Sequence, residues 1–72
     1  MAYRIDFFMQ FNGHKEVKRK HKFYATKKAF DVYWKYHAEF EDYMNSIRTG
    51  SNYTSRIAGY DDKNKCIRRH PT

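Results

Sequence analysis

Residues 3 to 24 carry the pattern that most limits how this chain can fold. Over the nine residues from Tyr3 to Phe11, apolar side chains alternate with mostly polar ones, which is the period of a half-buried β-strand. Asn12 and Gly13 follow directly, and this dipeptide favours the positive backbone φ angles of a tight hairpin turn. A second strand is therefore expected to run antiparallel to the first, from about Lys15 to Tyr24.

The alternation of the second strand predicts a row of lysines on one of its sides. One side carries Val17, Arg19, His21 and Phe23, and the other carries Lys18, Lys20, Lys22 and Tyr24. We expect Val17 and Phe23 to join the core. Phe8 and Tyr24 should then share the sheet face of the lysines, which would place aromatic rings among cations.

A helix is expected from Lys27 to about Arg48, with Thr26 as its N-cap and Gly50 as its stop. Its apolar residues recur at spacings of three and four: Phe30, Tyr33, Trp34, His37, Phe40, Met44 and Ile47. The centre of the core is expected to hold Phe7, Phe23, Phe30, Tyr33 and Phe40.

Val32, Tyr36 and Tyr43 widen the apolar side of this helix beyond what one small sheet can cover. These three residues are candidate partner-binding residues, either for another protein or for a second copy in a homodimer. The alternative is that the segment around Tyr53 and Ile57 folds back over them.

The remaining chain predicts a strand from Tyr53 to Tyr60, a turn at residues 61–64 and a short strand from Lys65 to Arg69. Together these elements give an α+β fold of order β-β-α-β-β, with a small antiparallel sheet packed against one long helix. Nothing in the composition marks a boundary, so a single domain over residues 1–72 is expected.

Charge is concentrated in residues 14–28, which hold seven of the fifteen Lys and Arg residues against one acid, Glu16. The formal net charge of the whole chain is +7. A polyanion such as nucleic acid is the partner that such density favours, because each cation set against a phosphate can release a counterion. Lysines along an outer strand also prevent aggregation between sheet edges, which is the simpler interpretation of the same residues.

Catalytic and metal chemistry find little support in the sequence. Cys66 and His70 are four residues apart, but a structural zinc needs four ligands in paired spacings. Glycine-rich phosphate loops and nucleophile motifs are missing as well. We therefore expect no enzyme, no metal and no cofactor. The lone Cys66 and the lack of a long apolar run predict a cytoplasmic protein that does not enter membranes.

One local resemblance bears on the partner. Residues 22–30, Lys-Phe-Tyr-Ala-Thr-Lys-Lys-Ala-Phe, resemble the strand-to-helix junction of AP2-like and integrase arm-type DNA-binding domains. In those domains three strands precede the helix and their exposed basic residues face DNA, whereas two precede it here. The resemblance implies that Lys18, Lys20 and Lys22 would face the nucleic acid.

Two classes of function follow. The first is a non-catalytic nucleic-acid-binding module of low sequence specificity, using Lys15, Lys18, Arg19, Lys20, Lys22, Lys27, Lys28, Phe8 and Tyr24. The second is a small phage or mobile-element protein that inhibits a host nucleic-acid-handling or defence complex by binding to it. The sequence does not decide between them.

Overall fold

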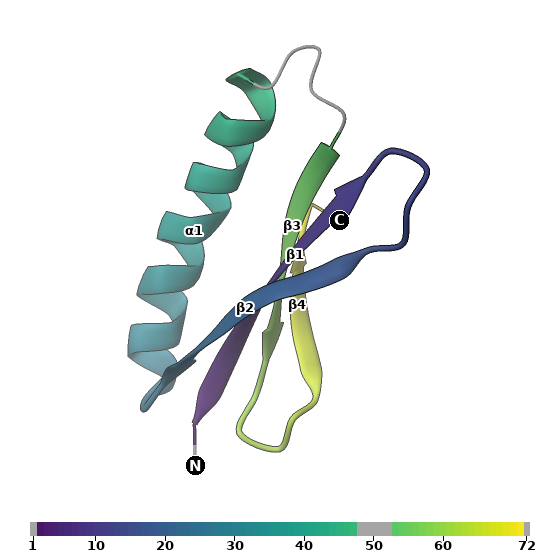
Figure 1. Ribbon diagram of the computed structural model, residues 1–72. Coiled ribbons are helices and arrows are strands. Elements are labelled where there is room, and N and C mark those ends of the chain that lie inside the picture. Colours follow the sequence, from purple (N-terminus) through teal and green to yellow (C-terminus); the bar gives the residue numbers. More distant parts are fainter. Residues whose placement is uncertain (1, 48–52, 72) are drawn as a thin grey trace.

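The hairpin expected from the sequence forms one half of a four-stranded antiparallel sheet (Figure 1). The computed structural model describes residues 2–47 and 53–71. Its elements are β1 (Tyr3–Phe11), β2 (Val17–Tyr24), α1 (Lys27–Ile47), β3 (Tyr53–Tyr60) and β4 (Cys66–His70). The strand order β2-β1-β3-β4 makes β2 and β4 the edges. Helix α1 lies against one face of the sheet, the helix face, and the opposite face is called the open face (Figure 1). The predicted α+β fold of order β-β-α-β-β is confirmed.

Local polar contacts explain where the elements begin and turn. Gly13 has a φ of 80°, and the His14 amide donates to the carbonyl of Phe11 at 3.0 Å, so a turn forms at Asn12 and Gly13 as predicted. Asn12 does not take the expected positive φ, and β2 starts at Val17, two residues later than predicted. The Ala29 amide donates to Thr26 Oγ1 at 3.1 Å, so Thr26 caps α1 as expected. The helix stop predicted at Arg48 and Gly50 lies outside the described residues.

The second turn is also confirmed, with the strand after it. Asp61 Oδ1 accepts from the amides of Lys63 and Lys65, both at 2.9 Å. β4 then starts at Cys66, one residue later than expected.

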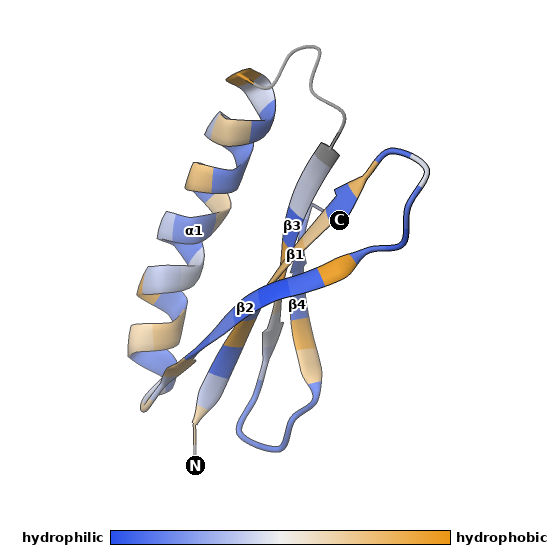
Figure 2. Ribbon diagram, in the orientation of Figure 1, coloured by the Kyte–Doolittle hydropathy of each residue, from blue (hydrophilic) through white to orange (hydrophobic). Residues whose placement is uncertain are grey.

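A β-bulge in β2 changes the predicted pattern of faces. Phe7 pairs with Lys20 and the next residue, Phe8, pairs with Lys18, so Arg19 is the additional residue. The bulge puts Lys18 on the open face, opposite Phe8, while Lys20 and Lys22 point to the helix face beside α1. The predicted row was therefore wrong for Lys18 and Phe8, which lie on the open face, and right for Lys20, Lys22 and Tyr24, which share the helix face. In Figure 2, β2 is hydrophilic along most of its length.

The core lies between β1, β3 and the first half of α1. Its fully or almost fully buried members are Ile5, Phe7, Phe30 and Ile57, and Trp34 and Ala38 pack against them. Phe7 and Phe30 confirm two of the five predicted core positions. The other three were wrong, because Phe23, Tyr33 and Phe40 are 60%, 48% and 46% exposed. Val17, also expected in the core, is 60% exposed.

These errors have two causes. Alternation along β2 points Phe23 to the open face, where its pairing partner is Arg4. Helix α1 is rotated relative to the prediction, so that the residues toward the sheet are Phe30, Trp34, Ala38 and Glu41. Tyr33 and Phe40 consequently lie at the side of the helix.

Candidate nucleic-acid interface

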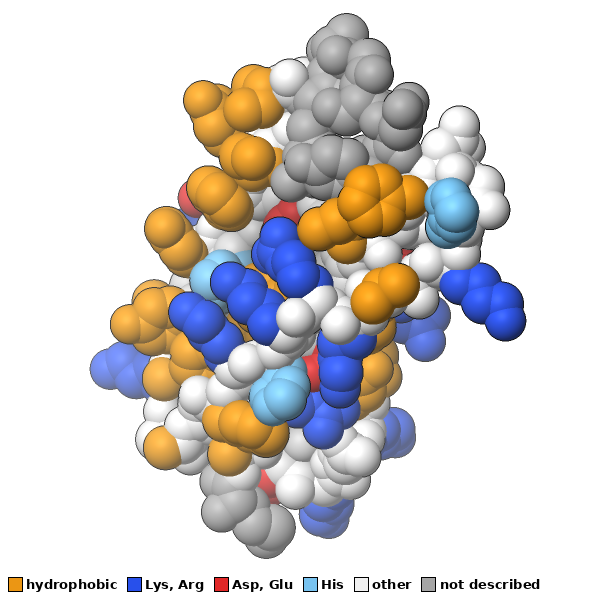
Figure 3. Space-filling view, in the orientation of Figure 1, with side chains coloured by type: hydrophobic (Ala, Val, Ile, Leu, Met, Phe, Trp, Pro, Cys, Tyr) orange, Lys and Arg blue, Asp and Glu red, His pale blue; other side chains and the backbone are white. Residues whose placement is uncertain are grey.

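A groove of about 230 Å³ lies between edge strand β2 and helix α1. It is lined by Phe7, Arg19, Lys20, Lys22, Tyr36, His37, Phe40 and Glu41. Figure 3 shows Lys and Arg side chains gathered over β2, with hydrophobic side chains of α1 beside them. The groove therefore joins part of the predicted basic segment to part of the predicted aromatic flank.

Ion pairs within the described part of the chain do not involve the cations of this groove. Among the described residues, no ion pair joins Arg19, Lys20 or Lys22 to a carboxylate. Lys20 Nζ lies 4.9 Å from the centroid of the Phe7 ring, which fixes one cation over the buried core. Glu41 also lines the groove, but its side chain is buried and accepts a hydrogen bond from the Ser55 hydroxyl.

The positive charges of the groove affect the pKa of His37. Burial lowers its pKa below the usual 6.5, and the positive charges of Lys22 and Lys20 lower it further. Its Nε2 lies 3.4 Å from the Tyr24 hydroxyl, and its ring meets Phe7 edge to face with centroids 4.9 Å apart. The neutral imidazole is the form that these surroundings favour, so the positive charge of the groove comes from its Lys and Arg side chains.

On the α1 side, the groove is lined by Tyr36 and Phe40, which are part of a longer row of exposed rings on the helix. The aromatic row consists of Tyr33, Tyr36, Phe40 and Tyr43, which recur at spacings of three, four and three. Their exposed fractions are 48%, 60%, 46% and 61%. Tyr33 stacks on Tyr24 of β2, with ring centroids 5.1 Å apart and an interplanar angle of 21°. The row thus runs along the side of α1 that borders β2.

The open face also carries cations, but acids balance most of them. Arg4 Nε lies 2.9 Å from Asp6 Oδ1, and Lys18 Nζ lies 3.9 Å from Asp6 Oδ2. Arg56 binds Glu16 through two bonds of 2.5 Å, and the hydrogen bond from Arg56 lowers the pKa of Glu16.

Two aromatic rings of the open face, Phe8 and Tyr60, are covered by these same guanidinium groups, whereas Phe23 on this face is exposed. Arg56 lies 4.1 Å above the Phe8 ring and Arg4 lies 4.3 Å above the Tyr60 ring. A second hollow, of about 640 Å³, lies on this face, lined by Arg56, Ala58, Tyr60, Cys66, Arg69 and Pro71. Phe8, predicted to contact nucleic acid, therefore stacks on the chain's own arginine.

The remaining sequence-predicted site residues do not line the groove. Lys15 lies in the β1–β2 loop, where it borders a separate hollow with Phe11, Asn12, His14 and Val17. Lys27 and Lys28 are in the first turn of α1, and Lys27 Nζ contacts Asp31 Oδ2 at 3.2 Å. Val32, predicted to bind a partner, is 60% exposed on α1.

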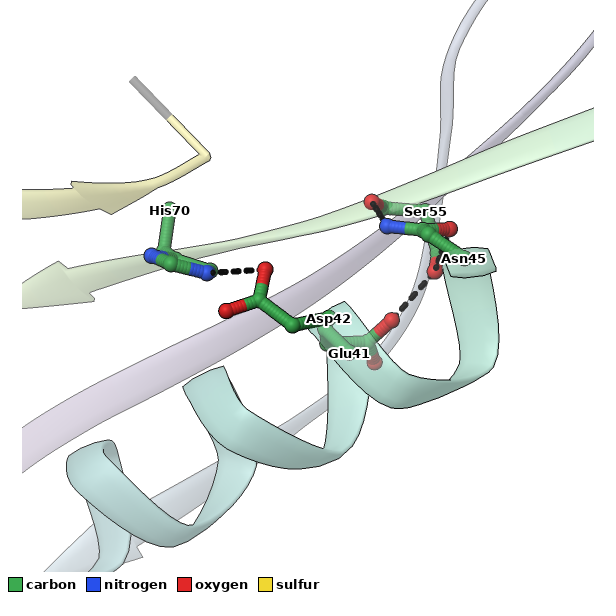
Figure 4. Close-up of polar contacts among 5 residues, drawn as sticks. All are labelled: Glu41, Asp42, Asn45, Ser55 and His70. Carbon is green, nitrogen blue, oxygen red and sulfur yellow. Dashed lines mark hydrogen bonds and ion pairs between the residues drawn. The ribbon is translucent and has the colours of Figure 1, made fainter. Parts of the chain in front are cut away.

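Polar contacts hold the other side of α1 to the sheet (Figure 4). Asn45 Nδ2 donates to the Ser55 carbonyl at 3.3 Å, next to the bond between Ser55 and Glu41. His70 Nε2 lies 2.8 Å from Asp42 Oδ1, and Arg68 on the same strand lies 2.6 Å from Asp31 Oδ1. These contacts orient α1 on the sheet and thereby set the direction of the aromatic row.

Cys66 and His70 do not come together. Cys66 borders the hollow of the open face, while His70 contacts α1 on the helix face. In the described ranges, no group of three or more His, Cys, Asp or Glu side chains is placed to hold a metal ion. No helix within the described part of the chain combines the length and the apolar character needed to cross a membrane.

Sequence reasoning found the basic residues of the groove but not its aromatic wall. Phe40 was expected in the core, and Tyr36 was assigned to a separate partner surface. The spacing of the row was visible in the sequence, whereas its position beside β2 depends on the rotation of α1. Comparison of the chain with protein-family models, curated proteins and solved structures found no match.

Proposed function

We propose that this protein is a small, non-catalytic nucleic-acid-binding module of low sequence specificity that acts in the cytoplasm. The observation that carries the proposal is the convergence of Arg19, Lys20 and Lys22 on one groove without acidic partners among the described residues. Cations set against phosphates favour binding through counterion release, and they do so for any base sequence. The free thiol of Cys66 supports a reducing compartment.

Exposed rings beside the cations support the same function. Tyr36 and Phe40 line the groove opposite the basic strand, and both are about half exposed. Grooves that combine cations with aromatic side chains bind nucleic acids by tracking the backbone and stacking on bases. Lysines that only protect a sheet edge from aggregation need no such neighbouring rings.

A paired set of charge variants tests this proposal. Lys20→Gln with Lys22→Gln removes two charges from the groove, and Lys63→Gln with Lys65→Gln removes two from the β3–β4 turn. Binding of labelled oligonucleotides would be followed by fluorescence anisotropy between about 50 and about 200 mM salt. We expect the groove pair to weaken binding and to reduce the slope of log K against log salt by about 1.4–1.8. Equal losses in both pairs, or binding that salt does not affect, would contradict the proposal.

A second candidate is a protein-binding inhibitor, for instance from a phage or mobile element. Extended by Ile47, the aromatic row has the alternating three- and four-residue spacing that pairs helices in coiled coils. Two results together would favour this second function. The parent protein would fail to bind nucleic acid, and it would pull down a protein partner that the Tyr36→Glu, Tyr43→Glu double variant no longer pulls down.

A further inference from the structure

We infer that the ligand is a single-stranded nucleic acid, whose bases stack on the aromatic row of α1 while Arg19, Lys20 and Lys22 hold its backbone. This inference rests on the proposed function and adds the strandedness of the ligand. It assigns a direct binding role to Tyr33, Tyr36, Phe40 and Tyr43, which the charge pattern alone does not select.

The first support is the one-sided distribution of charge. Arg19, Lys20 and Lys22 lie on the β2 wall of the groove, and the rings of Tyr36 and Phe40 lie on the α1 wall, together with the buried Glu41. Residues 27–47 of α1 contain three Lys and four Asp or Glu residues, which gives the helix a net charge of −1. A helix inserted into the major groove of a duplex is flanked by two phosphate backbones, whereas the flank of α1 away from β2 carries two lysines, Lys28 and Lys35, among several acids. One wall of cations and one wall of rings instead match a strand with one backbone and one row of bases.

The second support is the exposure and the spacing of the rings in the aromatic row. Base faces are accessible only in an unpaired strand, because a duplex shows base edges in its grooves. With a rise of 1.5 Å per residue, neighbouring rings of the row lie about 4.5–6 Å apart along the helix axis. This repeat exceeds the roughly 3.4 Å between stacked bases of one duplex strand. It suits a strand whose bases are separated from one another and contact the row individually.

Other occupants fit the charges less well. A second copy of the chain would also carry a net charge of +7, and self-association would add the two like charges. A partner helix would need acidic residues along the flank that faces Arg19, Lys20 and Lys22. A second copy is an outcome that the sedimentation experiment below detects, and a partner helix is an outcome that the pull-down described above detects.

Three matched probes separate the bases from the backbone. They are a fluorescein-labelled oligothymidine of about 15 nucleotides, its duplex with oligoadenosine, and an abasic strand of the same length with the same phosphates. A site size of this order covers one small binding domain. We expect the oligothymidine to bind at least about tenfold more tightly than either the duplex or the abasic strand. The comparison uses the parent protein and does not depend on any variant folding.

Variants then locate the contact. Tyr36→Leu and Phe40→Leu are each expected to weaken oligothymidine binding about tenfold and to leave abasic-strand binding unchanged, because stacking is lost and charge is not. Phe23→Leu is the control, since this ring on the open face is as exposed as Tyr36, at 60%. Phe23→Leu should bind oligothymidine like the parent. Circular dichroism and melting curves establish that each variant is folded.

The remaining outcomes distinguish this inference from the proposed function. Equal affinity for all three probes, or equal effects of Phe23→Leu and Phe40→Leu, would overturn the inference and leave salt-dependent nucleic-acid binding intact. Failure to bind any probe would overturn both. The free protein could also sediment as a dimer, and the Tyr36→Glu, Tyr43→Glu double variant as a monomer. This result would show that a second copy covers the row, and it would also overturn the inference.

Discussion

Gly59→Ala tests how closely α1 packs on the sheet. A Cβ atom at position 59 would lie 2.6 Å from Cζ of Phe30 and 3.1 Å from Cζ3 of Trp34. Ordinary contacts of a Cβ atom are 3.4–4 Å, so the Phe30 ring would have to retreat by roughly 1 Å. Phe30 is 0% exposed and is also in contact with Tyr3, whose ring centroid is 5.4 Å away, which limits this retreat.

The expected loss follows from two opposing effects. Overpacking of a core costs about 1–3 kcal/mol, while replacing Gly by Ala stabilises by up to about 1 kcal/mol through the unfolded chain. We expect a net loss of about 1–2 kcal/mol, out of a total stability of roughly 4–11 kcal/mol for 72 residues. The melting temperature should then fall by roughly 4–16 °C.

Thermal and urea unfolding, followed by circular dichroism, measure this loss. Phe30→Leu in the Gly59→Ala background provides the control, because a smaller side chain relieves the contact. The double variant should be more stable than the sum of the single losses predicts, by about 1 kcal/mol. A Gly59→Ala protein as stable as the parent, or strictly additive losses, would refute the reasoning.

Three further predictions concern the site and its support. Burial lowers the pKa of His37 in the folded protein, so the unfolded chain binds a proton at this residue more readily. The free energy of unfolding should therefore be unaffected by this residue above about pH 6.5 and should decrease as the pH falls below it. Melting curves between about pH 7 and pH 5 should show this decline, and His37→Gln should reduce it. Ser55→Ala removes the hydroxyl that donates to the buried Glu41 and should cost about 1–3 kcal/mol in urea unfolding; Glu41→Gln in the same background should recover part of the loss. Thr26→Ala removes the N-cap of α1 and should cost about 1 kcal/mol, measured in the same way.

The order of the elements was predictable because each one has a strong local signal. The alternation of β1, the Asn-Gly turn and the cap at Thr26 depend on residues that are close in sequence. Each of these signals acts within a few residues, where the backbone geometry follows from the residue types alone. The α+β fold and its order therefore followed from the sequence.

The faces of β2 were not predictable in the same way. A count of period two assumes a regular ladder, and the insertion of Arg19 breaks that ladder between Phe7 and Phe8. The bulge brings Arg19 next to Lys20 in the groove and leaves Lys18 within reach of Asp6 on the open face. The composition of β2 predicts its positive charge, but it does not predict the residue at which the register shifts.

The rotation of α1 on the sheet could not be predicted from the sequence for a different reason. The helix carries two apolar stripes, one beginning with Phe30 and Trp34 and one formed by the aromatic row, and either could have faced the sheet. Gly59 leaves room for Phe30 and Trp34, and Ser55 provides a partner for Glu41. Both partners belong to β3, far along the chain, so the sequence of α1 alone could not choose between the stripes.

Glu41 is the acid that lines the groove, and the acids that form ion pairs lie elsewhere, which explains why the groove stays positive. Asp6 and Glu16 pair with cations of the open face, whereas Asp31 and Asp42 contact Arg68 and His70 of β4. All four of these acids are held away from β2's helix-facing side.

Among the described strands, none lies outside edge strand β2 to supply further carboxylates. Protection of an edge from aggregation would be served by lysines pointing to either face of the strand. It would not require Lys20 and Lys22 to point toward α1, nor the half-exposed rings of Tyr36 and Phe40 opposite them. In the described part of the chain, cations without ion pairs and exposed rings meet on one groove, which a nucleic-acid strand can use and which edge protection leaves unexplained.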